Sequence, residues 1–289
     1  MTPRFTRRFR VRHYELDALG RVHGVSFLRY MQEAAIEAST ALGFSPDWYN
    51  ERGVGWVVRK LAVRYHAPAV YGDEVEVATW LSGIRGVRSI REYDLTRVRD
   101  GVRVARGRAE WVYLDTQTGQ PTRVPDEWAE AFPGIGKVEE LGVRPSNSRP
   151  TENAHRYSSR RRVQFHELDA VQHVNHTVYV YWTEEAGLDA LRAAGHALEP
   201  DSRIARRLRQ TGHEIQYFAP AVEGENIEIV SWLAEIGEDG LAWTHEIYNA
   251  DTRKLLVRDY SAGVLLDAVG KPGAPSQSII EAVLRGATG

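Results

Sequence analysis

The sequence predicts an α+β protein built from two tandem domains, each with one long central helix wrapped by an antiparallel sheet. Two observations support this fold class. Groups of residues recur at one constant spacing along the 289-residue chain, and within each copy a stretch with helical periodicity precedes several stretches with strand periodicity. A helix on one face of an antiparallel sheet leaves the other face for solvent or a partner.

The repeat has a constant offset of 152 positions. The segment Glu-Leu-Asp-Ala at 15–18 returns at 167–170. Further pairs at this offset are Tyr65 with Tyr217, Ala67–Val70 with Ala219–Val222, Gly72 with Gly224, Trp80 with Trp232, Arg106 with Arg258 and Asp115 with Asp267. Because the register never slips, the two copies are predicted to have nearly equal element lengths. Two such units in one chain imitate a two-fold dimer, so we expect a monomer acting as a pseudo-dimer, or a homodimer.

The predicted boundaries follow from composition. Residues 1–135 form the first domain and 156–289 the second, with its C-terminal tail. The stretch between them, 136–155, is rich in Pro, Gly, Ser and Asn and has no periodicity, as Pro145–Pro150 illustrates. It therefore reads as a linker.

Each copy shows the same order of elements. A short strand, about Phe9–Tyr14 and Arg162–His166, precedes a turn and then a long helix. The helices are predicted at Ser26–Leu42 and Thr177–Ala194, and they end at glycines, as helices commonly do. Alternating apolar residues then mark strands at 61–65, 75–79, 102–104, 215–217, 227–229 and 264–266, with a continuous apolar run at 111–114 and a short final helix at about 278–284.

Composition excludes several classes of protein. The net charge is −2 and there are no cysteines, which removes disulfides, zinc–thiolate sites and a cysteine nucleophile. No apolar run is long enough to span a bilayer. The basic residues between Arg4 and Arg12 have the charge of a transit peptide, but they alternate with apolar residues as in a strand. We favour the strand and therefore expect a cytoplasmic protein. Nucleic acid is disfavoured as a partner by the acidic total and by the lack of a recognised motif.

One segment of the second copy carries a family resemblance. Asp169–Tyr179, which contains His-Val-Asn, followed by Trp182 and Glu184–Ala186, resembles the signature of hotdog thioesterases. In the first copy, Phe9–Glu15, Met31–Ala34, Trp56–Val58 and Trp111–Asp115 are similar to plant and bacterial acyl-ACP thioesterases, where ACP is acyl carrier protein. The resemblance implies tandem hotdog domains of the 4-hydroxybenzoyl-CoA thioesterase-like superfamily that hydrolyse fatty acyl-ACP to free fatty acid and ACP.

Thioester hydrolysis requires few groups, because a thioester is already activated toward attack. A carboxylate activates water or attacks directly, and the N-terminus of a helix stabilises the oxyanion. Asp169 lies about eight residues before the second long helix, so a loop can bring its carboxylate to that end. By the resemblance, Asp169 is general base or nucleophile and His173 orients water or the carboxylate. Asn175 belongs to the His-Val-Asn element, although capping the helix is an equal explanation for it.

The sequence also departs from the family pattern. Plant acyl-ACP thioesterases have an asparagine at the position of Val171, and a glutamate–cysteine pair that aligns best with Pro220 and Ala221. The first copy keeps Asp17 but has Arg21 and His23 where the second copy has His173 and Asn175. Asp17 therefore marks either a second active site or a degenerate structural copy.

Further expectations concern ligands and alternatives. Trp56, His23 and Tyr179 are predicted to contact substrate. No cofactor and no metal are expected, although His166, His173 and His176 cluster in the sequence. The substrate is acyl-ACP or, in an alternative reading, acyl-CoA. Two further alternatives are a non-catalytic acyl-binding hotdog protein and a hotdog dehydratase.

Overall fold

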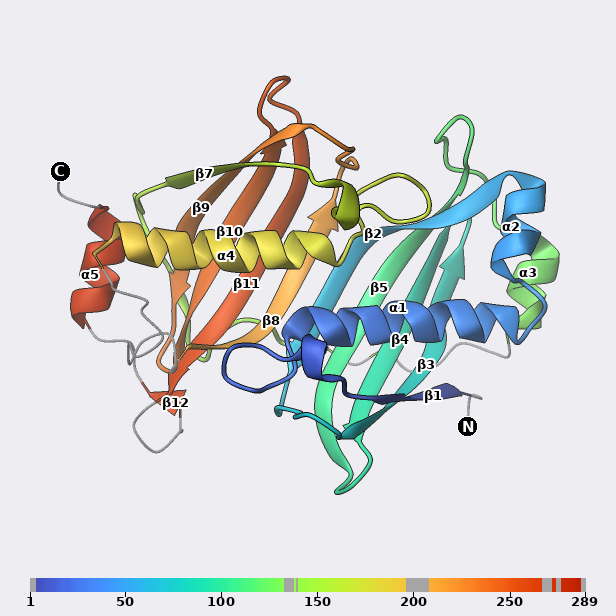
Figure 1. The fold of residues 1–289 in the computed structure, drawn as a ribbon, viewed down its shortest axis with the longest axis horizontal. Coiled ribbons are helices and arrows are strands. Elements are labelled where there is room, and N and C mark those ends of the chain that lie inside the picture. The colour runs from blue at the N-terminus through green and yellow to red at the C-terminus, as the bar shows by residue number, and fades with distance from the viewer. Residues whose placement is uncertain are drawn as a thin grey trace. The chain divides into compact units, whose positions relative to one another are not determined.

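The computed structural model describes residues 4–132, 138, 140–195, 208–266, 272–273 and 277–286. The chain forms two compact units, Met1–Leu141 (unit 1) and Gly142–Gly289 (unit 2). In each unit one long helix lies against one face of an antiparallel sheet (Figure 1). The predicted α+β class with two tandem hotdog-like units is confirmed.

Unit 1 is an antiparallel sheet in the order β1-β3-β4-β5-β2 with three helices. The helix α1 lies close to β5 because Gly107 has no side chain, and a Cβ there would be 2.6 Å from the Met31 sulfur. The elements are β1 (Phe5–Arg10), α1 (Gly24–Thr40), α2 (Pro46–Arg52), β2 (Val54–Tyr65), β3 (Glu74–Arg85), β4 (Arg88–Arg97), β5 (Val102–Asp115) and α3 (Asp126–Ala131).

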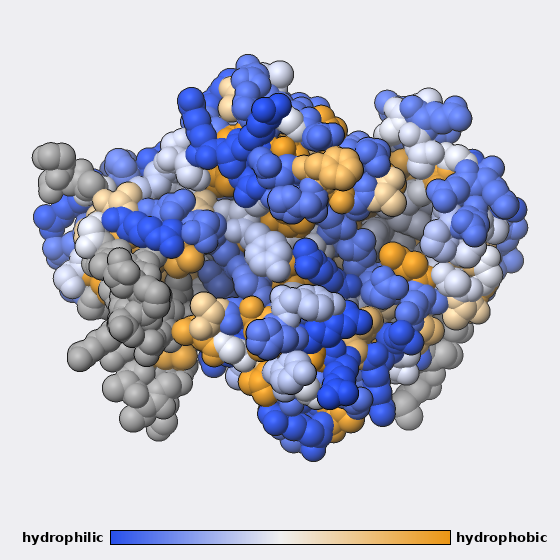
Figure 2. Space-filling view, in the orientation of Figure 1, coloured by the Kyte–Doolittle hydropathy of each residue, from blue (hydrophilic) through white to orange (hydrophobic). Residues whose placement is uncertain are grey.

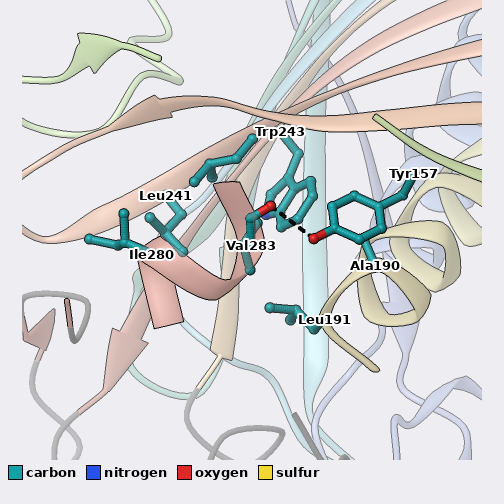
Figure 3. Packing of buried hydrophobic residues seen from close by; sticks show 8 residues of the cluster. Tyr157, Ala190, Leu191, Leu241, Trp243, Ile280 and Val283 are labelled. Carbon is teal, nitrogen blue, oxygen red and sulfur yellow. Dashed lines mark hydrogen bonds between the residues drawn. The ribbon is translucent and has the colours of Figure 1, made fainter. Parts of the chain in front are cut away.

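Unit 2 repeats this order as β7-β9-β10-β11-β8, with the long helix α4 in the place of α1. A terminal helix, α5, closes one end of its core: the Tyr157 hydroxyl donates to the Val283 carbonyl at 2.8 Å (Figure 3). The elements are β6 (Arg149–Pro150), β7 (Tyr157–Arg162), α4 (Val178–Ala193), β8 (Leu208–Tyr217), β9 (Asn226–Ile236), β10 (Gly240–Asn249), β11 (Leu255–Leu266), β12 (Pro272–Gly273) and α5 (Gln277–Arg285).

Several predicted elements differ from the structure. The first strand of each copy lies earlier than expected, and residues 13–14 and 165–166, expected to be strand, fall in single 3-10 turns at 13–15 and 165–167. Strands β4 and β10 and helices α2 and α3 were not predicted. The glycines at the helix ends were predicted correctly: Gly43 and Gly195 follow α1 and α4 with φ of 93° and 84°.

The stretch expected to be a linker packs on unit 2 where it is described. Val143 is buried against Ala242 and Ala262. Arg144 and Ser148 both bind the Glu235 carboxylate, and β6 pairs with the end of β9. This segment therefore belongs to the sheet edge of unit 2. Residues 136, 137 and 139 of the predicted linker lie outside the described residues.

On the face drawn in Figure 2, hydrophilic side chains predominate and apolar ones are scattered between them. Among the described residues, no helix combines the length and apolar character that crossing a membrane requires.

Candidate active site

The loop from Asp169 to Thr177 leads into α4 and folds into a tight turn. The Asp169 N–H donates to the His173 carbonyl at 2.9 Å, and the Gln172 N–H donates to the Asp169 carbonyl at 3.0 Å. Gln172 takes a left-handed conformation with φ of 62°. Asp169 and His173 are therefore held opposite each other at the neck of the turn.

The buried side chain of Glu167 holds this loop against α4. Glu167 binds the Arg161 guanidinium, and its Oε1 accepts the indole N–H of Trp182 on α4 at 2.9 Å. Its Oε2 accepts the Gln164 N–H at 2.8 Å. Because Trp182 lies one turn inside α4, this contact sets the position of the loop relative to the helix start.

The Asp169 carboxylate is partly buried and accepts two hydrogen bonds from its own loop. Its Oδ1 accepts the Val171 N–H at 3.1 Å, and its Oδ2 accepts the side-chain amide N–H of Asn175 at 3.3 Å. The carboxylate is thus oriented, and its remaining acceptor positions can bind a water.

Asn175 has two roles at once. Its Oδ1 accepts the Thr177 N–H at 3.0 Å and the Thr177 hydroxyl at 2.8 Å, which caps the start of α4. Its amide nitrogen holds Asp169, as described above. Capping and carboxylate positioning are therefore parts of one arrangement, and it places Asp169 at the positive end of a sixteen-residue helix.

The two histidines of the segment differ in their surroundings. His173 is partly buried at the neck of the turn, next to Asp169. His176 packs edge-on against the Tyr217 ring, and the Tyr217 hydroxyl donates to its carbonyl at 2.9 Å. Burial lowers the pKa of His176 to about 4, so it is neutral at pH 7. The described residues contain no metal-binding cluster of three His, Asp or Glu.

The segment after Tyr217, at the end of β8, lies beside the Asp169–Thr177 loop. The Val174 N–H donates to the Ala221 carbonyl at 2.9 Å, and the Ala221 N–H donates to the Tyr179 hydroxyl at 2.9 Å. Pro220 and Ala221, where plant enzymes have glutamate and cysteine, therefore sit next to Asp169's loop without supplying an acid or thiol. Tyr179, predicted to contact substrate, is only 3% exposed and supports this segment.

In unit 1 the matching carboxylate is tied into an ion pair. Asp17 Oδ2 accepts from Nε and Nη2 of Arg21 at 3.1 and 3.0 Å. Its Oδ1 accepts the N–H groups of Leu19 and Arg21 at 2.8 and 3.0 Å. His23 caps α1 by accepting the Val25 N–H at its Nδ1, 3.3 Å away. The turn is preserved, but its carboxylate is saturated with donors.

The third predicted substrate contact, Trp56, lies at the other end of unit 1. Its ring packs on Tyr113 and Trp128, with centroids 4.9 and 4.8 Å away. This aromatic cluster also holds Phe44, just past the C-terminal end of α1, whereas His23 begins that helix. The structure therefore does not bring Trp56 to the Asp17 turn.

A polar network under α4 was missed by sequence reasoning. His213 Nδ1 lies 3.0 Å from Asp259 Oδ2, which also accepts the Thr183 hydroxyl at 2.6 Å. Burial alone lowers the pKa of His213, but Asp259 and Glu184 outweigh it and raise the pKa to about 10. The signal was available: at the repeat offset, Leu61 and Gly107 of unit 1 match His213 and Asp259, so polar residues stand at apolar core positions.

Comparison with known proteins gives one family match in each half of the chain. Residues 2–132 match the model "Acyl-ACP thioesterase N-terminal domain", and residues 163–283 match the model "Thioesterase-like superfamily". Unit 1 is thus similar to acyl-ACP thioesterases, and unit 2 to the wider thioesterase-like superfamily. The two matches fall on the two units that the structure separates.

Individual relatives are distant. A chloroplastic acyl-[acyl-carrier-protein] hydrolase of Cuphea viscosissima is 27% identical over 194 residues, which cover 63% of this chain and 47% of the relative. The chain thus spans about half the length of the curated relatives it matches.

Solved structures share the fold across nearly the whole chain. The 12:0-ACP thioesterase from Umbellularia californica superimposes with a TM-score of 0.71 at 20% identity, covering 91% of this chain and 94% of that one. An acyl-ACP thioesterase from Bacteroides thetaiotaomicron gives 0.67 at 17% identity, covering 89% and 96%. At these identities the likeness establishes the tandem hotdog fold.

Proposed function

We propose that this protein is a thioesterase that hydrolyses fatty acyl-ACP to free fatty acid and ACP. The observation that carries the proposal is the Asp169 carboxylate, held by Asn175 at the start of α4. The match of residues 2–132 to the acyl-ACP thioesterase model and the names of the relatives, which are acyl-ACP hydrolases and thioesterases, support the substrate class.

The reaction follows from this arrangement. Asp169 accepts a proton from water while the water oxygen bonds to the thioester carbonyl carbon, and the charge that develops on the carbonyl oxygen is stabilised by the positive end of α4. The carbon–sulfur bond then breaks, and the leaving thiolate takes the proton back from Asp169. In an alternative route, Asp169 attacks the thioester carbonyl carbon directly and displaces the thiolate. The resulting anhydride is then hydrolysed by water. His173 is placed to orient the water or the carboxylate.

A substitution at Asp169 tests the function. Asp169→Asn removes the base but keeps the shape of the side chain, so we expect kcat/KM for acyl-ACP to fall by roughly 10² to 10⁴-fold, with an unchanged circular dichroism spectrum. Thiol release is measured with the same acyl chain on ACP and on CoA. Full activity in Asp169→Asn would end the assignment of this residue.

The carrier panel also separates the alternatives. A clear preference for ACP supports the proposal, and a preference for CoA makes the protein an acyl-CoA thioesterase of the same fold. Tight acyl-thioester binding without thiol release would favour the non-catalytic acyl-binding alternative. The presence of the apolar Pro220 and Ala221, which supply no acid or thiol, is consistent with that alternative.

Location and assembly are part of the proposal. We infer a cytoplasmic enzyme, since the basic residues near the N-terminus form β1, which pairs with β3. A monomer acting as a pseudo-dimer, or a homodimer, is the proposed assembly. Cell fractionation and sedimentation at micromolar concentration test these two points.

A further inference from the structure

Exposed apolar side chains are concentrated near the turns that precede α1 and α4. Among the described residues, fourteen large apolar side chains are exposed, and eight of them lie in the segments 13–20, 70–71, 165–171 and 218–222. These segments make up a small part of the chain, whereas single exposed apolar residues elsewhere need no explanation. A concentration of this kind is typical of a surface that binds a partner.

In unit 2 the exposed apolar side chains flank the Asp169 turn. Phe165 is 73% exposed and begins the 3-10 turn before Asp169, and Val171 is 60% exposed two residues after it. Val222 is exposed as well, next to Ala221, whose carbonyl accepts a backbone N–H of the Asp169 loop at 2.9 Å. We call Phe165, Val171 and Val222 the apolar rim.

Backbone hydrogen bonds hold the two segments of the apolar rim together. The Val163 N–H donates to the Glu225 carbonyl at 3.0 Å, and the Gly224 N–H donates to the Val163 carbonyl at 3.3 Å. Arg162 Nε donates to the Gly224 carbonyl at 3.0 Å. The apolar rim therefore spans two adjacent connections, β7 to α4 and β8 to β9, next to the start of α4 (Figure 1).

Charged side chains border the apolar rim. Arg162 is exposed, and no carboxylate among the described residues forms an ion pair with it. Arg160 is exposed too, and its ion pair with Glu228 is long, at 4.0 Å. Of the acids on the second segment, Glu225 accepts a backbone N–H at 3.1 Å, whereas Glu223 is exposed. An apolar centre bordered by arginines resembles the composition of protein–protein interfaces.

Unit 1 has a similar surface without an open carboxylate. Tyr14 is 76% exposed in the matching turn, but Asp17 is held by Arg21. A partner that delivers a thioester therefore has to be bound beside Asp169, and the turn of unit 1 offers a matched comparison.

We propose that the apolar rim, together with Arg160 and Arg162, is the surface on which ACP docks. ACP carries its acyl chain on a phosphopantetheine arm, so its body has to rest within reach of Asp169 during hydrolysis. It is an acidic protein, which suits the two arginines. Coenzyme A has no protein surface to place on Phe165. This inference rests on the proposed hydrolysis of acyl-ACP.

The kinetic test compares one acyl chain on ACP and on free pantetheine, with the full chain as enzyme. Phe165→Ala should lower the ratio of the two kcat/KM values by about tenfold, through KM for acyl-ACP, as expected of an aromatic residue central to an interface. Val222→Ser should lower it less. Both side chains are exposed, so both variants are expected to fold. Tyr14→Ala is the control and should leave the ratio unchanged.

Charge substitutions should act with opposite signs. Arg162→Glu should weaken the binding of holo-ACP several-fold at low salt, and Glu223→Lys should strengthen it. Both effects should disappear at about 1 M salt, where the Debye length is about 3 Å. The effect of Phe165→Ala should persist there, because burial of apolar surface is not screened. Isothermal titration calorimetry with holo-ACP measures all three.

Holo-ACP carries no acyl group, so its binding separates this inference from the function it rests on. If neither thioester is hydrolysed but Phe165→Ala weakens holo-ACP binding by about tenfold, the function fails and the docking surface stands. If acyl-ACP is hydrolysed while Phe165→Ala and Val222→Ser change neither the ratio nor holo-ACP binding, the docking surface is overturned.

Two further results would also overturn the inference. One is an effect of Tyr14→Ala equal to that of Phe165→Ala. The other is flotation of the full chain with vesicles of phosphatidylethanolamine and phosphatidylglycerol that is lost in Phe165→Ala, without any binding of holo-ACP. The apolar rim would then bind a membrane surface.

Discussion

At the scale of single residues, Asp17 and Asp169 occupy the same turn with different partners. Arg21 forms a two-pronged ion pair with Asp17, whereas His173 stands at the matching position beside Asp169. The N-cap changes as well, from His23 to Asn175, and only Asn175 has an amide that reaches back to the carboxylate. Two substitutions thus separate a saturated carboxylate from one with open acceptor positions. This favours the degenerate reading of the first copy.

The residue-scale prediction concerns Asp17→Asn. Because Asp17 is saturated by Arg21 and two backbone N–H groups, this change should leave thioester hydrolysis within about twofold of wild type. It should lower the free energy of unfolding by about 1 kcal/mol, the range for a hydrogen bond to a charged but partly exposed group. Urea unfolding and thiol-release assays measure the two effects. A variant that folds normally but is inactive would place the active site in unit 1.

At the scale of elements, the start of α4 is where a helix cap also orients the proposed catalytic carboxylate. Asn175 caps the helix with its oxygen and holds Asp169 with its nitrogen. Unit 1 begins α1 differently: a Cβ on Gly24 would lie 2.7 Å from the Tyr65 hydroxyl oxygen. In unit 2, His176 takes the matching position and Tyr217 instead donates to its carbonyl. The helix starts therefore diverge while the helices themselves remain similar.

Substitutions at Asn175 separate the two roles. Asn175→Asp keeps an oxygen that caps α4 but replaces the amide donor by a second carboxylate. We therefore expect near-normal stability and at least about tenfold lower kcat at pH 7. The activity should recover as the pH is lowered and the two carboxylates come to share a proton. Asn175→Ala loses both contacts and about 1 kcal/mol of stability. Melting curves and a pH–rate profile provide the comparison. Equal activity in wild type and Asn175→Asp would reduce Asn175 to a cap.

At the scale of the whole molecule, the two copies have divergent interiors. Beneath α1, Met31 packs on Gly107. Beneath α4, the matching positions hold Thr183 and Asp259, which bond to each other, and Asp259 also binds His213. His245 lies between the hydroxyls of Ser231 and Ser261, at 2.8 and 3.1 Å. Unit 2 therefore contains titratable groups in its core, and its stability should depend on pH.

The sign of that dependence follows from the pKa values. Burial lowers the pKa of His245 to about 4, against 6.5 for an ordinary histidine; Asp259 and Glu184 act to raise this pKa, and His213 acts to lower it further. The unfolded chain thus binds more protons below pH 6.5, and stability falls as the pH drops from 6.5 to 4. The pKa of His213 is raised to about 10, so its contribution is complete below pH 6.5 and is lost as the pH rises to 10.

We therefore expect the thermal unfolding midpoint to be highest near pH 6.5 and to decline on both sides. Differential scanning calorimetry between pH 4 and 10 measures this. His245→Phe should reduce the decline on the acid side only, without removing it, because burial also lowers the pKa of His176 to about 4. His213→Leu should flatten the alkaline side while lowering stability overall, since Asp259 then loses its cation. A midpoint that stays constant from pH 6.5 to 10 would contradict the His213–Asp259 ion pair.

The strongest sequence signals were periodic or local. The constant offset of 152 positions predicted two equivalent units, and glycines predicted the ends of α1 and α4. Strand β4 was missed because Arg91, Glu92 and Asp94 interrupt its apolar alternation. The first strands were placed too late, because the 3-10 turns at 13–15 and 165–167 continue the polar–apolar pattern of β1 and β7.

The sequence by itself determined the tandem hotdog fold and pointed to the Asp169 segment, because repeats and short motifs are properties of neighbouring residues. Tertiary structure decided which groups meet. It places the Asn175 amide in contact with Asp169 and pairs Asp17 with Arg21. It also separates Trp56 from His23 and buries Arg91 in an apolar interior. Burial and partner choice depend on contacts between strands and helices far apart in the chain, and no local pattern encodes them.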